Sequence, residues 1–274
     1  MTSMNILITG ANSYIGTSFE KFIKQFNAEH SEIEPYIVHT LDMQSINWRE
    51  YDFSKYDSVI HLAGIVHIKE TESNKELYYK INRDLAFDTA QKAKESNVKQ
   101  FIYFSTMSVY GLLTGIINAN TPVNPQNAYG KSKLEAEGLI KSLSDNHFKV
   151  AIVRPPMVYG KDCKGNYQTL CKIAKYSPIF PKFVNKRSMV SIERLCDYLF
   201  ELIKGNKDGV FFPQDKEYSC TSTIVKKLAN SYGRKIYFTK LFNPIIRFLL
   251  KSNSKIGKTI QKAFGNLIYD KKLV

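Results

Sequence analysis

Cysteine is scarce in this sequence, and long apolar runs are missing from it. The four cysteines, Cys163, Cys171, Cys196 and Cys220, include no C-x-x-C pair, which argues against a zinc site or a disulfide framework. We therefore expect no metal, and buried free thiols in a reducing cytoplasm. No stretch reaches the length of about 18 apolar residues that a membrane-spanning helix needs. The N-terminus also lacks the basic start and apolar centre of a secretion signal, which again favours a cytoplasmic protein.

Acidic residues are nearly absent from the C-terminal end. Residues 226–274 hold twelve Lys or Arg and one acid, Asp270, so this tail contributes +11 to the net charge of +14. The first 225 residues therefore carry the remaining +3. Nucleic-acid binding through the tail is one competing class of function. A purification unaffected by a high-salt wash, with no retardation of DNA, would exclude it, and we expect no nucleic-acid partner.

The basic tail also has a helical pattern. Asn243-Pro244 is typical of a helix start. Further on, lysines are interspersed with apolar residues that share one helical face, namely Ile256, Ile260, Ala263, Phe264 and Leu267. We favour a helix packed on the C-terminal lobe with its lysines outward. The alternative is peripheral contact with an anionic membrane, which liposome flotation would decide.

Short apolar runs alternate with helical periodicity over the first 160 residues. Because the runs show no polar alternation, they indicate buried parallel strands with helices on both faces. This pattern predicts an α/β fold with a doubly wound parallel sheet, a Rossmann domain over residues 1–160, whose ligands bind at the carboxyl ends of the strands. Strands are expected at 5–9, 36–41, 58–62, 101–104 and 150–153, and helices at 14–26, 76–96 and 131–144.

The pattern changes after residue 160. Loops lengthen and contain Pro178 and Pro181, and a helix is expected at 191–204 with a short strand at 210–213. We place a smaller substrate lobe at 161–274, which ends in the basic tail. Residues 187–213 are expected to return to the first domain.

A glycine-rich turn, Thr9-Gly-Ala-Asn-Ser-Tyr-Ile-Gly16, follows the first strand and opens the first helix. A pyrophosphate can bind the free N–H groups at such a helix start. The middle glycine of the G-x-x-G-x-x-G pattern is replaced by a serine, which narrows the space for phosphate but adds a hydroxyl donor. The alternative is an ordinary strand–helix turn. The cofactor-binding residues expected here are Gly10, Ser13, Tyr14, Ile15 and Gly16.

Other strand ends carry further cofactor candidates. Asp42 follows the second strand and could bind the adenosine ribose, or be a solvated strand-end residue. No arginine follows it directly, which favours NAD over NADP. Small residues would let a cofactor approach the end of the next strand, and Asn82 could tie adjacent strand ends together or simply cap a helix. The candidates at that strand end are Leu62, Ala63 and Gly64.

A Tyr-x-x-x-Lys pair, Tyr129 and Lys133, starts a predicted helix. At this spacing both side chains project from one helix face. A nearby ammonium favours the phenolate, so we expect Lys133 to lower the pKa of Tyr129 and make it a proton carrier. Thr106 precedes Tyr129 by 23 residues in a hydroxyl-rich strand end. Its hydroxyl could orient a substrate oxygen, or only satisfy the main chain. We expect Tyr129, Lys133 and Thr106 to be the catalytic residues.

Together these motifs resemble the extended short-chain dehydrogenase/reductases of the NAD-dependent epimerase/dehydratase type. The matching segments are Thr9–Gly16, His61–Gly64, Asn82, Ser105–Gly111, Tyr129–Lys133 and residues 153–160. Within that family, Arg154-Pro-Pro-Met-Val-Tyr-Gly160 followed by Lys164-Gly-Asn166 is most similar to bacterial enzymes that act at sugar C4. These are nucleotide-sugar 4-epimerases and 4-ketosugar reductases of surface-polysaccharide biosynthesis.

The resemblance implies a function and further site residues. It implies NAD(P)-dependent oxidoreduction at C4 of a nucleotide sugar, of UDP-HexNAc type, with NAD, or NADP, as cofactor. It adds Ser105 and Pro155 to the cofactor site. It implies that the substrate is bound by Ser108, Met157, Asn166 and Arg187, with the Arg187 fork on the diphosphate. Met157 departs from the epimerase pattern, which has Asn there, and a second substrate arginine has no clear match.

By the same resemblance the chain would form a homodimer through helices at 76–96 and 131–144. A competing class is a non-catalytic NAD(P)-sensing regulator of the same fold. Such a regulator predicts a damaged Tyr/Lys pair, whereas Tyr129 and Lys133 are both present. Tight retention of NAD would favour the epimerase, and stoichiometric use of reduced cofactor with a 4-ketosugar would favour the reductase.

Overall fold

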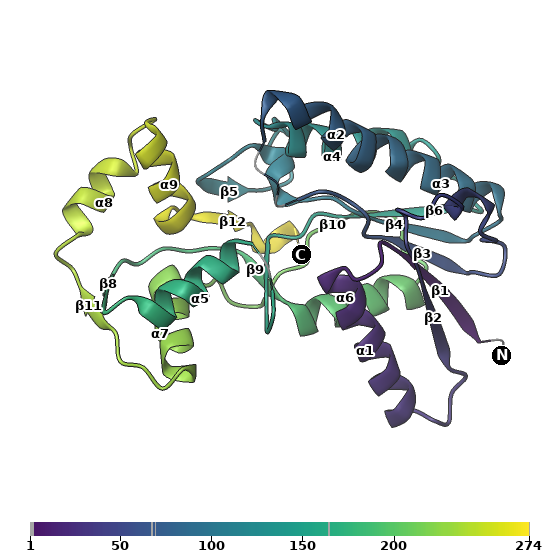
Figure 1. Cartoon of the computed structure of the whole chain (residues 1–274), viewed down its shortest axis with the longest axis horizontal. Coiled ribbons are helices and arrows are strands. Elements are labelled where there is room, and N and C mark those ends of the chain that lie inside the picture. Colours follow the sequence, from purple (N-terminus) through teal and green to yellow (C-terminus); the bar gives the residue numbers. More distant parts are fainter. Residues whose placement is uncertain (1–2, 67, 69, 164, 274) are drawn as a thin grey trace. The chain divides into compact units, whose positions relative to one another are not determined.

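A computed structural model describes residues 3–66, 68, 70–163 and 165–273, and the chain divides into two compact units, each described here by itself (Figure 1). The first unit comprises Met1–Gly111, Val123–Pro155 and Ile192–Pro213. The second comprises Leu112–Pro122, Pro156–Ser191 and Gln214–Val274. Of the segment 187–213 expected to return to the first domain, 192–213 belongs to the first unit and 187–191 to the second.

The first unit is built on a six-stranded sheet in which every pair of neighbouring strands is parallel. This arrangement confirms the predicted α/β doubly wound fold. The strand order is β10-β6-β4-β3-β1-β2. The strands are β1 (Met4–Thr9), β2 (Tyr36–Leu41), β3 (Ser58–His61), β4 (Gln100–Phe104), β6 (Lys149–Val153) and β10 (Gly209–Phe211).

Helices cover both faces of this sheet (Figure 1). On one face α1 packs against α6, where Phe26 and Phe200 meet with ring centroids 4.5 Å apart. On the other face lie α2, α3 and α4, over a core that includes Phe101, Tyr103 and Ile140. The helices are α1 (Tyr14–Glu29), α2 (Lys75–Tyr79), α3 (Leu85–Glu95), α4 (Ala128–Lys141) and α6 (Ile192–Lys204); the short helical turns are η1 (Trp48–Glu50), η2 (Glu72–Asn74), η3 (Lys80–Asp84) and η4 (Met107–Tyr110).

The strand order reverses at β1. The chain runs from β1 to β2 on one side, and then crosses to β3 on the other side of β1. In open α/β sheets, ligands bind beyond the carboxyl ends of the strands at such a reversal. The glycine-rich turn after Thr9 and the small residues after His61 both lie at this point.

The second unit contains three two-stranded parallel sheets and a separate core. That core gathers Ala174, Phe180, Val225, Ile246 and Phe264. The strands are β5 (Gly115–Ile117), β7 (Met157–Tyr159), β8 (Ile179–Pro181), β9 (Met189–Ser191), β11 (Tyr237–Thr239) and β12 (Leu267–Tyr269); the helices are α5 (Asn166–Tyr176), α7 (Thr221–Ser231), α8 (Asn243–Leu249), α9 (Lys255–Phe264) and the turn η5 (Lys271–Leu273).

Most of the apolar face expected in the basic tail is turned inward. Phe264 is buried, and Ile260 and Ala263 pack against the same core. Leu267 is buried in β12, whereas Ile256 remains 66% exposed. The favoured interpretation, a helix packed on its own lobe, therefore matches α9.

The four cysteines are free, but only Cys196 is buried. The expectation of buried thiols is therefore wrong for the others, which are half-buried, namely Cys163, Cys171 and Cys220. Within the described ranges, no helix combines the length and the apolar character needed to cross a bilayer.

Candidate active site

The glycine-rich turn joins β1 to α1 where the ends of β1 and β3 come very close. The N–H groups of Leu62 and Ala63 both donate to the carbonyl oxygen of Thr9, at 2.8 and 2.9 Å. Gly10 has a φ of +112°, and a Cβ added there would lie 2.6 Å from the nitrogen of Ala63. Only glycine fits this position, because the conformation and the space both exclude a side chain.

Ser13 occupies the place of the missing middle glycine and caps α1. Its φ of −68° is ordinary for any residue, and its hydroxyl accepts a hydrogen bond from the N–H of Gly16 at 3.2 Å. A Cβ added to Gly16 would lie 3.2 Å from Cγ2 of Ile8, so this glycine lets helix and strand approach. Tyr14 and Ile15, both half-buried, form the first turn of α1.

Main-chain donors around this turn suit a phosphate. Within the described part of the chain, the N–H groups of Ala11, Asn12 and Ile15 have no acceptor. A hollow of about 250 Å³ lies beside them. Free N–H groups at the positive end of a 16-residue helix fit the pyrophosphate of a dinucleotide. The hollow is lined by Gly10, Ala11, Asn12, Ser13, Gly16, Thr17, Glu20 and Thr40.

Asp42 is exposed directly after β2, and the preceding residue, Leu41, accepts a hydrogen bond from the N–H of Gly10 at 3.0 Å. The carboxylate of Asp42 accepts only from the N–H of Gln44 among the described residues. Sequence analysis missed a second carboxylate, that of Glu20 on α1, which is hydrogen-bonded to the hydroxyl of Thr40 at the hollow. The spacing of Glu20, one helical turn after Gly16, could have revealed it.

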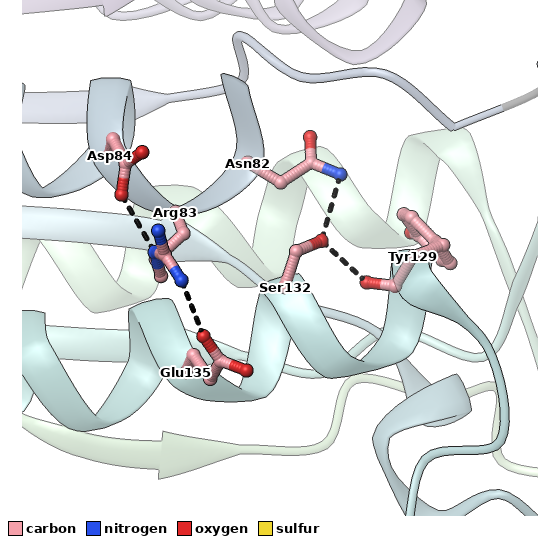
Figure 2. Close-up of polar contacts among 6 residues, drawn as sticks. All are labelled: Asn82, Arg83, Asp84, Tyr129, Ser132 and Glu135. Atoms are coloured by element: carbon pink, nitrogen blue, oxygen red, sulfur yellow. Dashed lines mark hydrogen bonds and ion pairs between the residues drawn. The ribbon is translucent and has the colours of Figure 1, made fainter. Parts of the chain in front are cut away.

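Asn82 lies in a π-helical turn, η3, between α2 and α3. Its side-chain amide accepts from the N–H of Ile65 at 2.9 Å and donates to the carbonyl of Ile65 at 3.1 Å. It also donates to the hydroxyl of Ser132 at 3.3 Å, and Ser132 donates to the carbonyl of Tyr129 at 3.0 Å (Figure 2). Asn82 therefore connects the loop after β3 to the start of α4. Its amide is engaged within the protein, so the geometry makes it a positioning residue.

A salt bridge links η3 to α4 near Asn82. The guanidinium of Arg83 donates to Asp84 at 2.7 Å and to Glu135 on α4 at 2.8 Å (Figure 2). Arg83 and Glu135 thus fix η3 against α4 beside the bond from Asn82 to Ser132.

Tyr129 stands in the first turn of α4 because Asn127 starts the helix two residues earlier. The amide oxygen of Asn127 accepts from the N–H of Gly130 at 2.8 Å. A Cβ added to Gly130 would lie 3.0 Å from the carbonyl oxygen of Ser108, so α4 begins in close contact with η4. This contact brings Tyr129 to Thr106, which caps η4 and shares a side-chain hydrogen bond with the phenol.

Burial raises the pKa of Tyr129 to about 12, while the hydrogen bond with Thr106 opposes that rise. The expectation that Lys133 lowers this pKa is therefore wrong for the protein without cofactor. The ammonium of Lys133 donates instead to the carbonyl of Phe104 at the end of β4, over 2.8 Å. Thr106 supplies the stabilisation of the phenolate that was attributed to Lys133.

Lys133 is buried near the carboxyl ends of β3 and β4. Burial lowers its pKa to about 7, and the nearby Glu137 carboxylate acts in the opposite direction. A Cβ added to Gly64 would lie 3.4 Å from the Lys133 nitrogen, so the loop after β3 runs directly past the ammonium. The charge of Lys133 also contributes to lowering the pKa of buried His61 to about 3, an effect due mainly to burial.

Sequence analysis missed a buried ionic network one turn further along α4. Glu137 forms a bidentate ion pair with Arg154, which also donates to the phenol oxygen of Tyr110 at 2.8 Å. Ser105 donates its hydroxyl to the same carboxylate, so that hydroxyl is not directed at a cofactor. The spacing of Tyr129, Lys133 and Glu137, four residues apart on one helix face, was the available signal.

The remaining sequence-predicted residues are distributed over both units. In the first unit, Ser108 is exposed on η4, and the carbonyl of half-buried Pro155 accepts from the N–H of Met107 at 3.1 Å. Met157 starts β7 in the second unit and is half-buried. Asn166 starts α5, but its side chain, like all of Lys164, lies outside the described residues.

Arg187 belongs to the second unit and is half-buried. Its main chain exchanges hydrogen bonds with Ser219, and its guanidinium donates to the carbonyl of Gly265 at 3.2 Å. Within the described ranges no carboxylate forms an ion pair with it. Burial lowers the pKa of the guanidinium.

Residues 6–177 match the model of the "NAD dependent epimerase/dehydratase family", which is well over half of the chain. The chain belongs to this family. It is therefore an enzyme of a group that uses NAD or NADP, which confirms the expected family and class of cofactor. The motifs in the matched region run from the glycine-rich turn to Tyr129 and Lys133 in the order that sequence analysis identified.

Two curated relatives cover most of the chain. A UDP-glucose 4-epimerase of Vibrio cholerae is 28% identical over 245 residues, which cover 82% of this chain and 75% of that protein. An N-acetyl-alpha-D-glucosaminyl-diphospho-ditrans,octacis-undecaprenol 4-epimerase of Escherichia coli O157:H7 is 26% identical over 246 residues, covering 85% and 73%.

Among solved structures, a dTDP-4-dehydrorhamnose reductase of Clostridium acetobutylicum aligns with a TM-score of 0.66 at 22% identity. The alignment covers 95% of this chain and 98% of that one. At this identity the likeness supports the fold alone. The family match places the chain among the NAD-dependent epimerases and dehydratases, and both curated relatives are named as 4-epimerases of sugars.

Proposed function

We propose that this enzyme catalyses NAD(P)-dependent oxidoreduction at C4 of a nucleotide sugar, as a 4-epimerase or a 4-ketosugar reductase. The observation that carries the proposal is the placement of the Thr106 hydroxyl by the phenol of Tyr129, where it acts to lower the pKa of that phenol. It pairs a proton carrier with a hydroxyl at the carboxyl end of β4, where the ammonium of Lys133 is also held. This combination suits a carbinol–ketone interconversion.

A bound nicotinamide dinucleotide would supply the acceptor or donor of hydride. In the oxidative direction, the C4–H and O4–H bonds of the sugar break as the C4=O4 double bond forms, and the O4 proton moves to Tyr129. In the reductive direction, Tyr129 returns this proton to O4. Thr106 orients O4, and Lys133 holds the ribose of the cofactor.

The chain's own groups account for cofactor binding. The pyrophosphate would bind the N–H groups of Ala11, Asn12 and Ile15, with Ser13 donating its hydroxyl. Asp42 would accept from the adenosine ribose. Glu20 places a further carboxylate at the hollow beside the glycine-rich turn. Because a phosphate on that ribose would meet like charge there, the arrangement favours NAD over NADP.

The proposed substrate is a UDP-HexNAc-type sugar of surface-polysaccharide biosynthesis. The partly desolvated guanidinium of Arg187 lacks an anionic partner among the described residues, and a diphosphate would offset its charge. Ser108, Met157 and Asn166 would complete the substrate site. The names of the relatives, one for a UDP-sugar and one for an undecaprenol-linked sugar, support a diphosphate-linked substrate. The paired helices α3 and α4 are the proposed homodimer surface.

The test is to release and identify the bound dinucleotide, and then to assay three substrates. These are UDP-GlcNAc, a 4-keto-6-deoxy UDP-HexNAc with reduced cofactor, and undecaprenol-diphosphate-linked GlcNAc. Formation of the C4 epimer without net cofactor use identifies an epimerase. Stoichiometric oxidation of reduced cofactor identifies a reductase. Failure of the purified, cofactor-loaded enzyme with all three would overturn the proposal.

A further inference from the structure

Exposed apolar side chains are concentrated on and around α8 in the second unit. The turn before α8 presents Leu241, which is 76% exposed, and the helix presents Ile245 and Phe248, which are 60% and 74% exposed. The spacing of three residues places Ile245 and Phe248 on one side of the helix, and Leu241 lies two residues before its start. The opposite side holds Ile246, which is 4% exposed and packs into the core of the unit. The fold therefore needs Ile246 inward, and leaves the other three to solvent.

Basic residues accompany this apolar side. Arg247 lies on α8, and Lys240 and Lys251 lie just before and just after the helix; all three are exposed. The neighbouring helix α9, which lies beside α8, adds the exposed residues Lys255, Ile256 and Lys258 (Figure 1). Between residues 237 and 264 there are six Lys or Arg and no Asp or Glu. We call this region the α8 surface, and define it as Lys240, Leu241, Ile245, Arg247, Phe248, Lys251, Lys255, Ile256 and Lys258.

We propose that the α8 surface docks on an anionic phospholipid bilayer. Such an interface accepts apolar side chains below the headgroups and cations at their level, and α8 offers both on adjacent sides. A second copy of this chain would bring like charges together without an acid to pair them. A nucleic acid would attract the cations but offers no apolar layer for Leu241 and Ile245.

The proposal goes beyond the proposed reaction and does not depend on it. The enzyme would work at the membrane surface whether its substrate is soluble or carried on a lipid. It also differs from the alternative weighed for the tail sequence, because the inward residues of α9 take no part, and only the exposed Ile256 of that apolar set belongs to the α8 surface.

Flotation of the full chain with defined vesicles tests the docking. Two vesicle types are needed, one of phosphatidylcholine alone and one with about a third phosphatidylglycerol, which supplies the negative surface potential. We expect the protein to float with the anionic vesicles at low salt. It should not float with them at high salt, and it should not float with the neutral vesicles. Absence of flotation with the anionic vesicles at low salt would overturn the proposal.

Two double variants separate the apolar and the basic contribution. Ile245→Ser with Phe248→Ser, and Arg247→Glu with Lys251→Glu, should each lower binding by about tenfold or more. Matched controls lie in the first unit: Ile46→Ser, at a residue 92% exposed, and Lys21→Glu with Lys24→Glu on α1 should bind like the unmodified protein. Equal loss in the controls, or no loss in either α8 variant, would count against the α8 surface.

Thermal melting and turnover of a soluble nucleotide sugar are followed in every variant. Both should be unchanged in the α8 variants, since their residues lie outside the proposed site. Binding that disappears with melting and turnover intact supports docking. Flotation therefore fails or succeeds independently of the assays that test the proposed reaction. If the protein does not bind vesicles but retards DNA, or forms a dimer, and the α8 variants abolish that binding, the surface belongs to another partner and the bilayer is rejected.

Discussion

The ammonium of Lys133 donates to the main-chain oxygen of Phe104 at 2.8 Å, and this bond holds the lysine at the end of β4. Tyr129, one helical turn earlier, depends on Thr106 and not on Lys133 for the hydrogen bond that favours its phenolate. The two members of the Tyr-x-x-x-Lys pair thus have separate supports in the protein before it binds cofactor. Each support can be removed by itself.

Replacing Tyr129 with Phe removes the proton carrier and keeps the ring. Because positioned acid–base groups contribute roughly 10²–10⁴ in rate, turnover should fall by about that factor. Dinucleotide binding should persist, since the phosphate-binding turn is untouched. The measurements are steady-state turnover and the amount of cofactor released per protein. Full activity in Tyr129→Phe would contradict the assigned chemistry.

Replacing Thr106 with Val removes the hydrogen bond that lowers the pKa of Tyr129. The pKa should rise, because the phenolate loses stabilisation while the burial that disfavours it remains. In the oxidative direction, where Tyr129 accepts a proton, the rising limb of the pH–rate profile should move to higher pH. Thr106→Ser keeps the hydroxyl and should leave the limb in place. A shift to lower pH in Thr106→Val would refute this role.

Replacing Lys133 with Met should change how stability depends on pH. The folded-state pKa of about 7 lies below the ordinary value of 10.5, so the unfolded chain binds more protons between these values. The lysine therefore destabilises the fold most below about pH 7, and its cost declines as pH rises toward 10.5. The melting temperature of Lys133→Met minus that of the wild type should therefore be larger at pH 7 than at pH 10. A difference that does not vary with pH would exclude this account.

Replacing Glu137 with Gln should leave the guanidinium of Arg154 buried without its carboxylate. Breaking a buried pair in this way costs about 3–5 kcal/mol of stability. The exposed pair of Lys75 and Glu72 offers the control, because a solvent-exposed ion pair contributes little to stability. Denaturant unfolding of Glu137→Gln and Glu72→Gln measures both. Similar losses in the two variants would show that the network around Glu137 is not desolvated as described.

Much of the fold was accessible from sequence because its strands are short runs rich in apolar residues. Tyr36–Leu41 was predicted with its observed bounds, between Pro35 and Asp42. The helix expected at 131–144 in fact begins at Ala128, because Asn127 caps it. The π-helical turn around Asn82 left no sign in the sequence, where the helical pattern is continuous from α2 to α3.

The residues of the candidate site were easier to predict from the sequence than the contacts between their side chains. Tyr129 and Thr106 do meet, but the direction of the Lys133 side chain depends on where β4 ends in space, which spacing does not reveal. The hydroxyl of Ser105 is engaged by Glu137, a residue more than thirty positions away in the chain. Such contacts arise from tertiary packing, so local pattern alone did not determine them.

The two units are interleaved along the chain, which passes from one to the other five times. The chain leaves the first unit after Gly111 and forms β5 in the second unit. This strand pairs with β12, whose last residue is Tyr269. During synthesis β5 must therefore wait until Tyr269 has emerged before it can complete its pairing with β12. A truncation that removes β12 would leave β5 without its pairing partner. Because each unit is made of three separate segments, no single cut in the gene would yield either unit alone.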